Sequence, residues 1–323
     1  MTIRSGMSGD AVTRIEQFLS NLKLYRGPAD GSFGGGVEAG VKTYQKRQGL
    51  PITGAVDAAT WGRMFPSVPP PVSEIAICDL ADRCLALTGS FETSSYPPDC
   101  FCGLSGDFDH MGLSFGALQW NVGQGTLQPL LMQMWDQHAD VARDIFHEHF
   151  DTVTALRTAS PEEQLAFARS VQTQTKVNEP WKGMLVALGR TPEFQGVQTD
   201  HASKIYTRAL QMCGDYGLLS ERAVALMFDI ATQCGSISDV VRAQITADFA
   251  HLIQTNSSNE VAKMFAVANR CAAASKPVYV DDVRNRKLTI ANGTGTVHDS
   301  YYDLSDMFGI TLNPFAQAKA VGE

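Results

Sequence analysis

The stretch that decides the fold spans residues 89–121 and reads GSFETSSYPPDCFCGLSGDFDHMGLSFGALQWN. Glu92 ends an apolar segment whose members recur at the spacing of one helical face, namely Ile77, Leu80, Cys84, Leu87 and Phe91. Asp107 and Asp109 follow after a loop rich in Ser, Pro, Cys and Gly, and a strand-like run over residues 113–118 comes next. The pattern predicts a helix end and a turn or hairpin that hold carboxylates across a cleft.

A pair of carboxylates across a cleft is what glycoside hydrolysis needs, with one protonated acid and one ionised base or nucleophile. We expect Glu92 to be the acid, because apolar burial raises the pKa of a carboxyl and Phe91 with its helix could supply such surroundings. A solvated glutamate at a helix end is the alternative. The second carboxylate is Asp107 or Asp109, and either could instead serve only as a turn residue.

The totals of the chain limit its class. Its 323 residues suffice for two domains, and 44% hydrophobic with 19% charged residues indicates a globular protein. A net charge of −8 argues against nucleic acid and against a basic membrane-binding face. No apolar run reaches the length of a membrane span. The first ten residues, MTIRSGMSGD, contain no apolar signal region, and the seven cysteines are an odd number, so we expect mostly reduced thiols and a cytosolic origin.

Two domains are predicted on either side of a proline-rich linker. Residues 6–65 contain three short helix patterns joined by Asp/Gly turns, which predicts a small helical bundle. Residues 66–73 read PSVPPPVS, which is typical of an extended, semi-rigid linker. The predicted domains are therefore 1–66 and 74–323, with the linker at 67–73.

The second domain is predicted to be mainly helical. A helix should begin near Thr126, and a capping box with proline at the first helical position starts another at residues 160–163. Further helices are predicted over 193–213, 220–234, 238–254 and 258–275. Strands are expected only near 103–120. The end from Tyr279 onward is expected to be loop-rich and to return to the core through Tyr301, Tyr302, Leu304 and Phe308.

The first domain resembles the peptidoglycan-binding type 1 module. The resemblance rests on the leading Gly-Asp-x-Val, on the Asp-Gly-x-Phe-Gly turn at residues 30–34, on Tyr44-Gln45, and on the closing Gly-x-Val-Asp and Thr-Trp at residues 54–61. It covers nearly the whole unit. It implies a three-helix wall-binding bundle with bacterial peptidoglycan as its partner.

The stretch around the carboxylates resembles the lysozyme superfamily. The order Ser-Phe-Glu followed by Asp-x-x-Gly-x-Ser-x-Gly carries the likeness, and residues 109–116 are similar to the chitosanase branch. The resemblance implies an α+β domain with a short β-hairpin, Glu92 as general acid, Asp109 as base, and Ser114 as the residue that positions the attacking water. The arginine that chitosanases usually carry before this Gly is missing here, and Leu113 with Ser114 is a looser match.

Residues 115–121, FGALQWN, resemble the Phe-Gly-x-x-Gln strand of goose-type lysozymes and phage endolysins. Gln119, Trp120 and Asn121 would then bind the substrate, because an amide and an aromatic ring beside a sugar cleft hydrogen-bond and stack on the ring. The alternative is that Trp120 belongs to the core and Gln119 satisfies backbone groups.

Other features favour no site. His147-Glu148-His149 lacks the spacing that puts two histidine ligands on one helical face, so no metal is expected. Cys100-x-Cys102 is too tight for the usual zinc hook. The charged run that contains Asp281, Asp282, Arg284, Arg286 and Lys287 is expected to be a solvated surface, with a substrate-side arginine as the alternative.

Together these patterns predict a monomeric, cofactor-free muramidase of the phage endolysin type. The protein would stay in the host cytoplasm until a separate pore-forming protein releases it to the wall, and its partners would include neither nucleic acid nor membrane. A chitosanase, a lytic transglycosylase and a wall-binding protein without activity are the alternatives.

Overall fold

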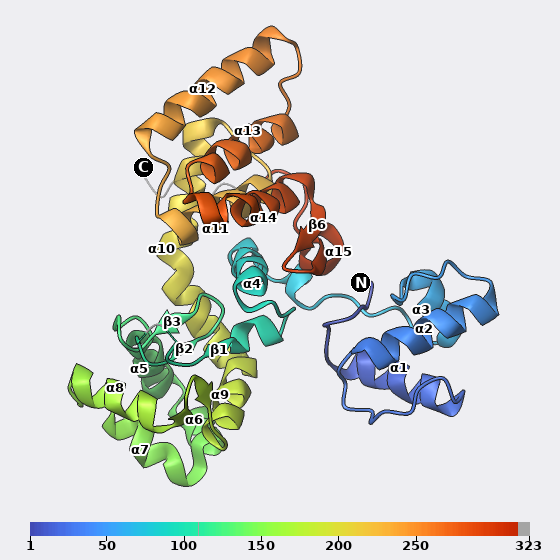
Figure 1. Cartoon of the computed structure of the whole chain (residues 1–323), viewed down its shortest axis with the longest axis vertical. Helices are drawn as coiled ribbons and strands as arrows, with labels where there is room; N and C mark the ends of the chain where they lie inside the picture. The colour runs from blue at the N-terminus through green and yellow to red at the C-terminus, as the bar shows by residue number, and fades with distance from the viewer. Residues whose placement is uncertain (109, 316–323) are drawn as a thin grey trace, which may run out of the picture.

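The computed structural model of the chain describes residues 1–108 and 110–315 (Figure 1). Its N-terminal unit consists of α1 (Asp10–Asn21), α2 (Gly35–Gln48) and α3 (Ala58–Met64). Val12, Ile15 and Leu19 of α1 are buried, whereas Leu22, which follows the helix, is 43% exposed. The Asp57 carboxylate caps α3 by accepting a hydrogen bond from the Thr60 amide at 2.7 Å. The buried Gln45 side chain holds the turn before α3 through hydrogen bonds with Thr53, Gly54 and Ala55.

The rest of the chain folds into two lobes that share the long helix α10 (Pro192–Tyr216) (Figure 1). The lower lobe contains β1 (Leu104–Ser105), β2 (Ser114–Phe115), β3 (Trp120–Asn121), α5 (Gln128–Gln137), α6 (Ala139–Phe146), η3 (His147–His149), α7 (Phe150–Ala155), α8 (Pro161–Ser170), β4 (Gln172–Thr173), β5 (Lys176–Val177) and α9 (Trp181–Arg190). The upper lobe contains α11 (Glu221–Cys234), α12 (Asp239–Gln254), α13 (Glu260–Ala273), η4 (Pro277–Tyr279), α14 (Val280–Asn292), β6 (Thr294–Val297), β7 (Ser300–Asp303) and α15 (Leu304–Phe308). Three elements complete the chain, namely η1 (Ile75–Ile77), α4 (Leu80–Thr93) and η2 (Asp99–Cys102).

One hydrophobic cluster lies in the lower lobe, and the other extends from the N-terminal unit through α4 into the upper lobe. The lower cluster includes Phe115 and Phe194, whose rings stack at 5.3 Å. The other cluster includes Phe91 of α4 and Tyr302, whose rings meet edge to face at 4.8 Å. The helix α10 enters the lower cluster with Phe194 and the other cluster with Ala209, so one helix connects both cores.

The mainly helical fold class is confirmed, with a three-helix bundle followed by a larger helical domain with short antiparallel hairpins. None of the helices in the described part of the chain has the length and apolarity that a membrane crossing needs. The domain boundaries at residues 66 and 73 stay predictions. All seven cysteines are free thiols in the structure.

Several sequence predictions about the second domain are wrong. Strands also form outside residues 103–120, because β4 pairs with β5 and β6 pairs with β7. The segment from Tyr279 to residue 315 is not loop-rich, since α14, the β6–β7 hairpin and α15 occupy most of it. The prediction that this segment returns to the core is correct for Tyr302, Leu304 and Phe308, which are buried. It is wrong for Tyr301, which is 40% exposed. Alternation in a four-residue strand places Tyr301 and Tyr302 on opposite faces.

The hairpin segment packs closely on the last turns of α4. The strands are antiparallel in the order β1-β2-β3, and Ser114 faces Asn121 across the pair β2–β3. A Cβ on Gly89 would lie 2.7 Å from the Ala117 Cβ, and one on Gly103 would lie 2.2 Å from the Thr93 Cγ2. The absence of side chains at both glycines therefore lets the hairpin approach the helix end that carries Glu92.

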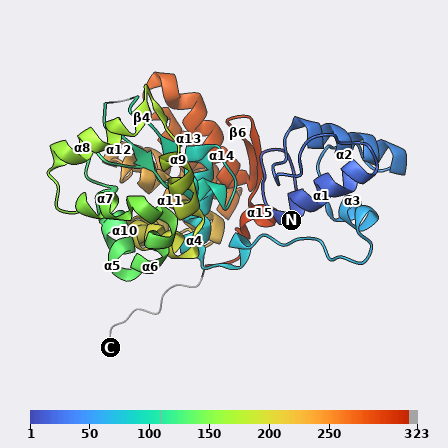
Figure 2. The same cartoon turned by 90° about the horizontal axis from the view of Figure 1, so that it is seen from below.

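The N-terminal unit is docked on the larger domain (Figures 1 and 2). The Ser8 hydroxyl donates a hydrogen bond to the Asp99 carboxylate, and the Thr2 amide donates one to the Asp306 carboxylate at 2.7 Å. The Arg4 guanidinium lies 4.5 Å from the centre of the Tyr301 ring. These contacts place the N-terminal unit beside η2, which follows the end of α4 in the chain.

We expect Gly89→Ala to lower the free energy of unfolding by about 1–3 kcal/mol, because the added methyl group overpacks the contact with Ala117. Urea denaturation measures the change. Gly196→Ala is the matched control, since a Cβ on this α10 glycine meets nothing within 4 Å and should stabilise the helix by about 0.5–1 kcal/mol. Equal stability of Gly89→Ala and the parent would contradict the close packing.

Candidate active site

Glu92 lies in the last turn of α4, with its side chain 30% exposed. Its Oε1 is 2.8 Å from Nη1 of Arg286, which comes from α14 of the upper lobe. The prediction that apolar groups surround Glu92 is therefore wrong in part, because a guanidinium holds one of its carboxylate oxygens. Phe91 is fully buried, and the Arg286 guanidinium carbon lies 5.1 Å from the centre of its ring.

Arg286 belongs to a buried network of charges. Its Nε donates to Oδ1 of Asp229 on α11 at 2.6 Å, and Asp229 is completely buried. The other oxygen of Asp229 accepts from Lys287 Nζ at 3.1 Å, and this amine also donates to Gln233 Oε1 at 2.5 Å. The network joins the end of α4 to the middle turns of α11 and α14.

The network pairs acidic with basic groups, because the carboxyl groups of Glu92 and Asp229 face Arg286 and Lys287. Burial opposes ionisation of Asp229, but Arg286 and Lys287 together hold its pKa below the ordinary value. Removing one partner of such a buried pair leaves an uncompensated charge away from water.

The charged run at residues 281–287 is only partly a solvated surface. Asp281 is 92% exposed and pairs with Arg284 at 3.0 Å, as a surface run would. Arg286 and Lys287 are 3% and 0% exposed, so the surface prediction is wrong for them. The sequence carried one signal for this network, since Asp229 interrupts an otherwise apolar helical stretch. Its partners lie 57 and 58 residues further along the chain.

Asp107 holds the turn before β2 in place. Its Oδ1 accepts from the Gly112 amide and its Oδ2 from Arg169 Nε, both at 2.7 Å. The hydrogen bond from Gly112 and the Arg169 guanidinium hold the pKa of Asp107 below its usual range, against a smaller effect of burial. Its own amide donates to Gln172 at 2.8 Å, so residues of α8 and β4 support this turn.

Asp109, the predicted base, lies outside the described residues. Ser114, the predicted water-positioning residue, is 8% exposed on β2, and its hydroxyl accepts from the Asn121 side-chain amide at 2.8 Å. Asn121 is 4% exposed, and its Oδ1 accepts from the Gln124 amide at 3.2 Å. The structure thus brings Ser114 and Asn121 together, with the Asn121 side chain supporting the hairpin.

Gln119 and Trp120 occupy the turn and strand after Ser114. Gln119 donates to the Gly116 carbonyl at 3.0 Å and accepts from the Ser105 hydroxyl at 2.7 Å. Trp120 is half-buried and packs against both hydrophobic clusters. These contacts match the alternative in which Trp120 belongs to the core and Gln119 satisfies a backbone group. Contact of either residue with a sugar stays a prediction.

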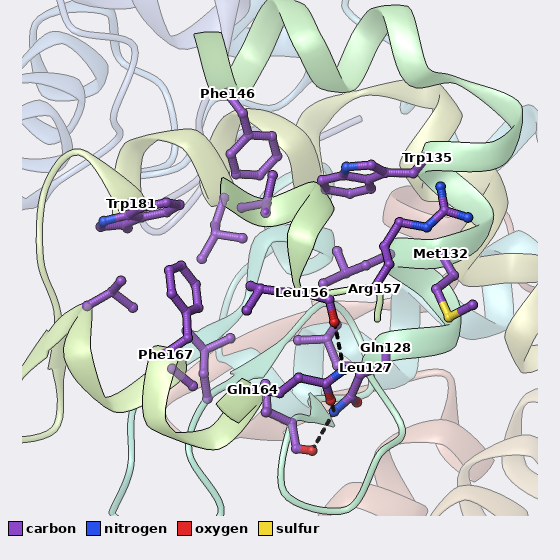
Figure 3. Close-up of a pocket in the computed structure, with 17 residues that line it drawn as sticks. Leu127, Gln128, Met132, Trp135, Phe146, Leu156, Arg157, Gln164, Phe167 and Trp181 are labelled. Carbon is purple, nitrogen blue, oxygen red and sulfur yellow. Dashed lines mark hydrogen bonds between the residues drawn. The ribbon is translucent and has the colours of Figure 1, made fainter. Parts of the chain in front are cut away.

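A separate apolar pocket of about 110 Å³ lies within the lower lobe (Figure 3). It lies away from Glu92 and is lined mainly by apolar side chains, among them Leu127, Leu131, Trp135, Phe146, Phe167 and Trp181. At one end Gln128 donates to Gln164 at 2.9 Å, as Figure 3 shows. The scarcity of polar groups makes this pocket unsuitable for a sugar, which needs several hydrogen-bond partners.

Glu92 is a partly exposed carboxylate at the end of a helix on which the hairpin packs. Glu92 is fixed through Oε1, and in the described part of the chain its Oε2 makes no hydrogen bond or ion pair. A carboxyl oriented in this way presents one oxygen for proton transfer. Burial raises the pKa of the Cys102 thiol to about 12, so this thiol is un-ionised at neutral pH and is a weak nucleophile.

We expect Asp229→Asn to destabilise the protein by about 3–5 kcal/mol, because Arg286 and Lys287 lose the buried charge that compensates them. Urea denaturation measures this change. Asp248→Asn is the control, since Asp248 pairs with Arg270 at 2.6 Å where both side chains are partly exposed. A loss of about 0–1 kcal/mol is expected there. Equal losses in the two variants would show that burial of the network adds nothing.

The contribution of Asp107 to stability should depend on pH. The pKa of Asp107 is lower in the folded protein than in the unfolded chain, so its stabilising effect is complete above about pH 4. The effect is lost as the pH falls through the folded value. The difference in unfolding free energy between the parent and Asp107→Asn should therefore shrink between pH 6 and pH 3, as urea titrations at each pH would measure. A difference that is constant over this range would contradict the ionised pairing.

Comparison with known proteins gives the following similarities. Residues 8–64 match the family described as "Putative peptidoglycan binding domain". No curated protein matches the chain. A chitosanase co-crystallised with its substrate is similar with a TM-score of 0.45 and 16% identity, over 69% of this chain and 94% of that one. A chitosanase of glycoside hydrolase family 46 from Gynuella sunshinyii, in complex with chitotetraose, gives 0.39 and 14%, over 66% and 84%.

A native chitosanase from Bacillus subtilis gives a TM-score of 0.39 and 14% identity, over 67% of this chain and 87% of that one. The family match covers residues 8–64, and the similarity to the chitosanase structures carries no conclusion at these TM-scores.

Proposed function

We propose that this protein hydrolyses the glycan strands of bacterial peptidoglycan as a muramidase of the endolysin type. One observation carries the proposal. The Glu92 carboxylate is held by the buried Arg286 at the end of α4, where the hairpin that follows Asp107 and Asp109 in the chain packs on the helix. The match of residues 8–64 to a peptidoglycan-binding family supports the choice of substrate.

Glu92 is the general acid in this proposal and protonates the leaving glycosidic oxygen. Asp109 is the base, and Ser114 positions the attacking water. Asp107 is the weaker candidate for the base, because Gly112 and Arg169 already occupy both of its carboxylate oxygens. A base that acts through water implies inversion at the anomeric carbon, with carboxyl groups roughly 6.5–9.5 Å apart.

Arg286 takes the role of a positioning residue. A fixed guanidinium that holds Oε1 restricts the orientation of the Glu92 side chain. Catalysis gains when the acid already has the orientation that proton transfer requires. The buried Asp229 keeps the guanidinium in place and offsets its charge.

The N-terminal unit would attach the enzyme to the wall. Attachment raises the local concentration of glycan at the active site without adding a catalytic contact. The contacts of Ser8 with Asp99 and of Arg4 with Tyr301 support this role, because they hold the unit against the domain that carries Glu92. We propose action as a monomer, after release from the host cytoplasm to the wall.

Three other functions are consistent with parts of the same structure. A chitosanase would use the same carboxylates, but the match to a peptidoglycan-binding family favours wall glycan. A lytic transglycosylase would need Glu92 without a base and would release 1,6-anhydro sugars. A wall-binding protein without activity would bind and not cleave.

Glu92→Gln should bind purified peptidoglycan as the parent does and should lose at least about a hundredfold of its hydrolytic rate, because the amide keeps the shape and lacks the acid proton. Asp109→Asn should lose activity similarly, and Asp107→Asn should be milder. Co-sedimentation measures binding, and the release of reducing ends measures hydrolysis. Activity of Glu92→Gln near that of the parent would exclude Glu92 as the acid.

The products distinguish the alternatives. Mass spectrometry of the fragments identifies the bond that is cut and detects 1,6-anhydro ends, and proton NMR of the first product gives its anomer. Hydrolysis of chitosan but not of peptidoglycan would make the protein a chitosanase. Binding without cleavage of either polymer would leave a wall-binding protein.

A further inference from the structure

A surface pocket of about 560 Å³ lies beside the acidic turn. One side is formed by β1 and the residues that follow it, namely Leu104, Ser105, Gly106 and Phe108. The other side is formed by the β4–β5 hairpin and the start of α9, namely Thr175, Lys176, Val177 and Lys182. The pocket is therefore continuous with the chain segment that bears Asp107.

The two sides of the pocket are fixed to each other. A Cβ on Gly106 would lie 2.2 Å from the Thr175 carbonyl oxygen and 2.4 Å from Gln172 Oε1, so the turn and the hairpin are in direct contact. The Asp107 amide donates to Gln172 at 2.8 Å across the same contact. A ligand in this pocket would thus occupy a fixed position relative to the acidic turn.

The pocket is lined by two lysines that lack acidic partners. Lys176 and Lys182 are exposed, and neither forms an ion pair within residues 1–108 and 110–315. Asp107 lies nearby but is already paired with Arg169. Glu179 is the acidic residue between the two lysines in sequence, and its Oε2 accepts from the Gly183 amide at 3.0 Å. The lining therefore favours an anionic ligand.

The pocket also has an apolar side. Phe108 is 68% exposed, which is unusual for an aromatic side chain of this size, and Leu104 and Val177 line the same space. A ligand that fits carries carboxylates together with apolar groups. Peptidoglycan carries such a group on alternate sugars, in the form of a short peptide with free carboxylates. Chitosan carries protonated amines, which two lysines would repel.

We propose that this pocket binds the peptide stem of peptidoglycan, with Lys176 and Lys182 contacting its carboxylates and Phe108 contacting its apolar side chains. The inference rests on the proposed function and adds a specificity subsite to it. Opposite charges at an exposed site contribute at most about fivefold each, and at about threefold each the two lysines together contribute roughly tenfold. The contribution should weaken as salt is added.

The test uses the full chain and two soluble substrates, namely glycan strands with stems and the same strands after an amidase has removed the stems. Lys176→Gln/Lys182→Gln should raise the KM for stem-bearing strands roughly tenfold with kcat unchanged, because binding is lost equally in the ground and transition states. On bare strands the double variant should match the parent. Lys204→Gln, at an exposed lysine of α10 outside the pocket, should leave KM and kcat unchanged for both substrates.

The outcomes separate the subsite from the proposed function. Equal losses on both kinds of strand, or no loss on either, would overturn the stem subsite while leaving a muramidase in place. If the parent cleaves neither kind of strand, the proposed function fails, and calorimetry with the isolated stem peptide then decides. If the parent binds the stem peptide and the double variant does not, the stem subsite is retained. Equal binding of the peptide by both proteins would overturn it.

Discussion

The ion pairs of Arg286 are the interaction on which the rest of this structure depends. The guanidinium lies between two carboxylates, 2.8 Å from Glu92 and 2.6 Å from Asp229. The three residues come from α14, α4 and α11, so the pairs can form only when these helices pack in one arrangement. A desolvated guanidinium requires compensation by buried carboxylates, and this requirement makes the upper lobe and α4 a single unit.

Glu92 is held in position by both lobes. From the upper lobe, Arg286 holds one oxygen of Glu92. From the lower lobe, the hairpin packs against the same helix end, where Gly89 contacts Ala117 and Gly103 contacts Thr93. Small residues at these contacts let the backbone of the hairpin approach α4. Glu92 is therefore fixed by charge on one side and by packing on the other.

Local patterns predicted the helical class and the acidic segment, and they failed where the partners are distant in sequence. Glu92 at a helix end was visible because the apolar period of α4 stops beside it. The partnership of Asp229 with Arg286 was not visible, because 57 residues separate them and Arg286 lies in a run that resembles ordinary surface charge. The short strands β4 to β7 escaped prediction because two to four residues are too few to show alternation.

The two acidic elements depend on different supports, and this bears on the chemistry. Glu92 is tied to the upper lobe through Arg286, whereas the turn of Asp107 is tied to the lower lobe through Arg169 and Gln172. In the proposed mechanism, the distance between Glu92 on α4 and a base that precedes β2 in the chain depends on how the hairpin packs on α4. Because the separation of the carboxyl groups decides between inversion and retention, the contact of Gly89 with Ala117 would then influence the stereochemistry without contacting the sugar.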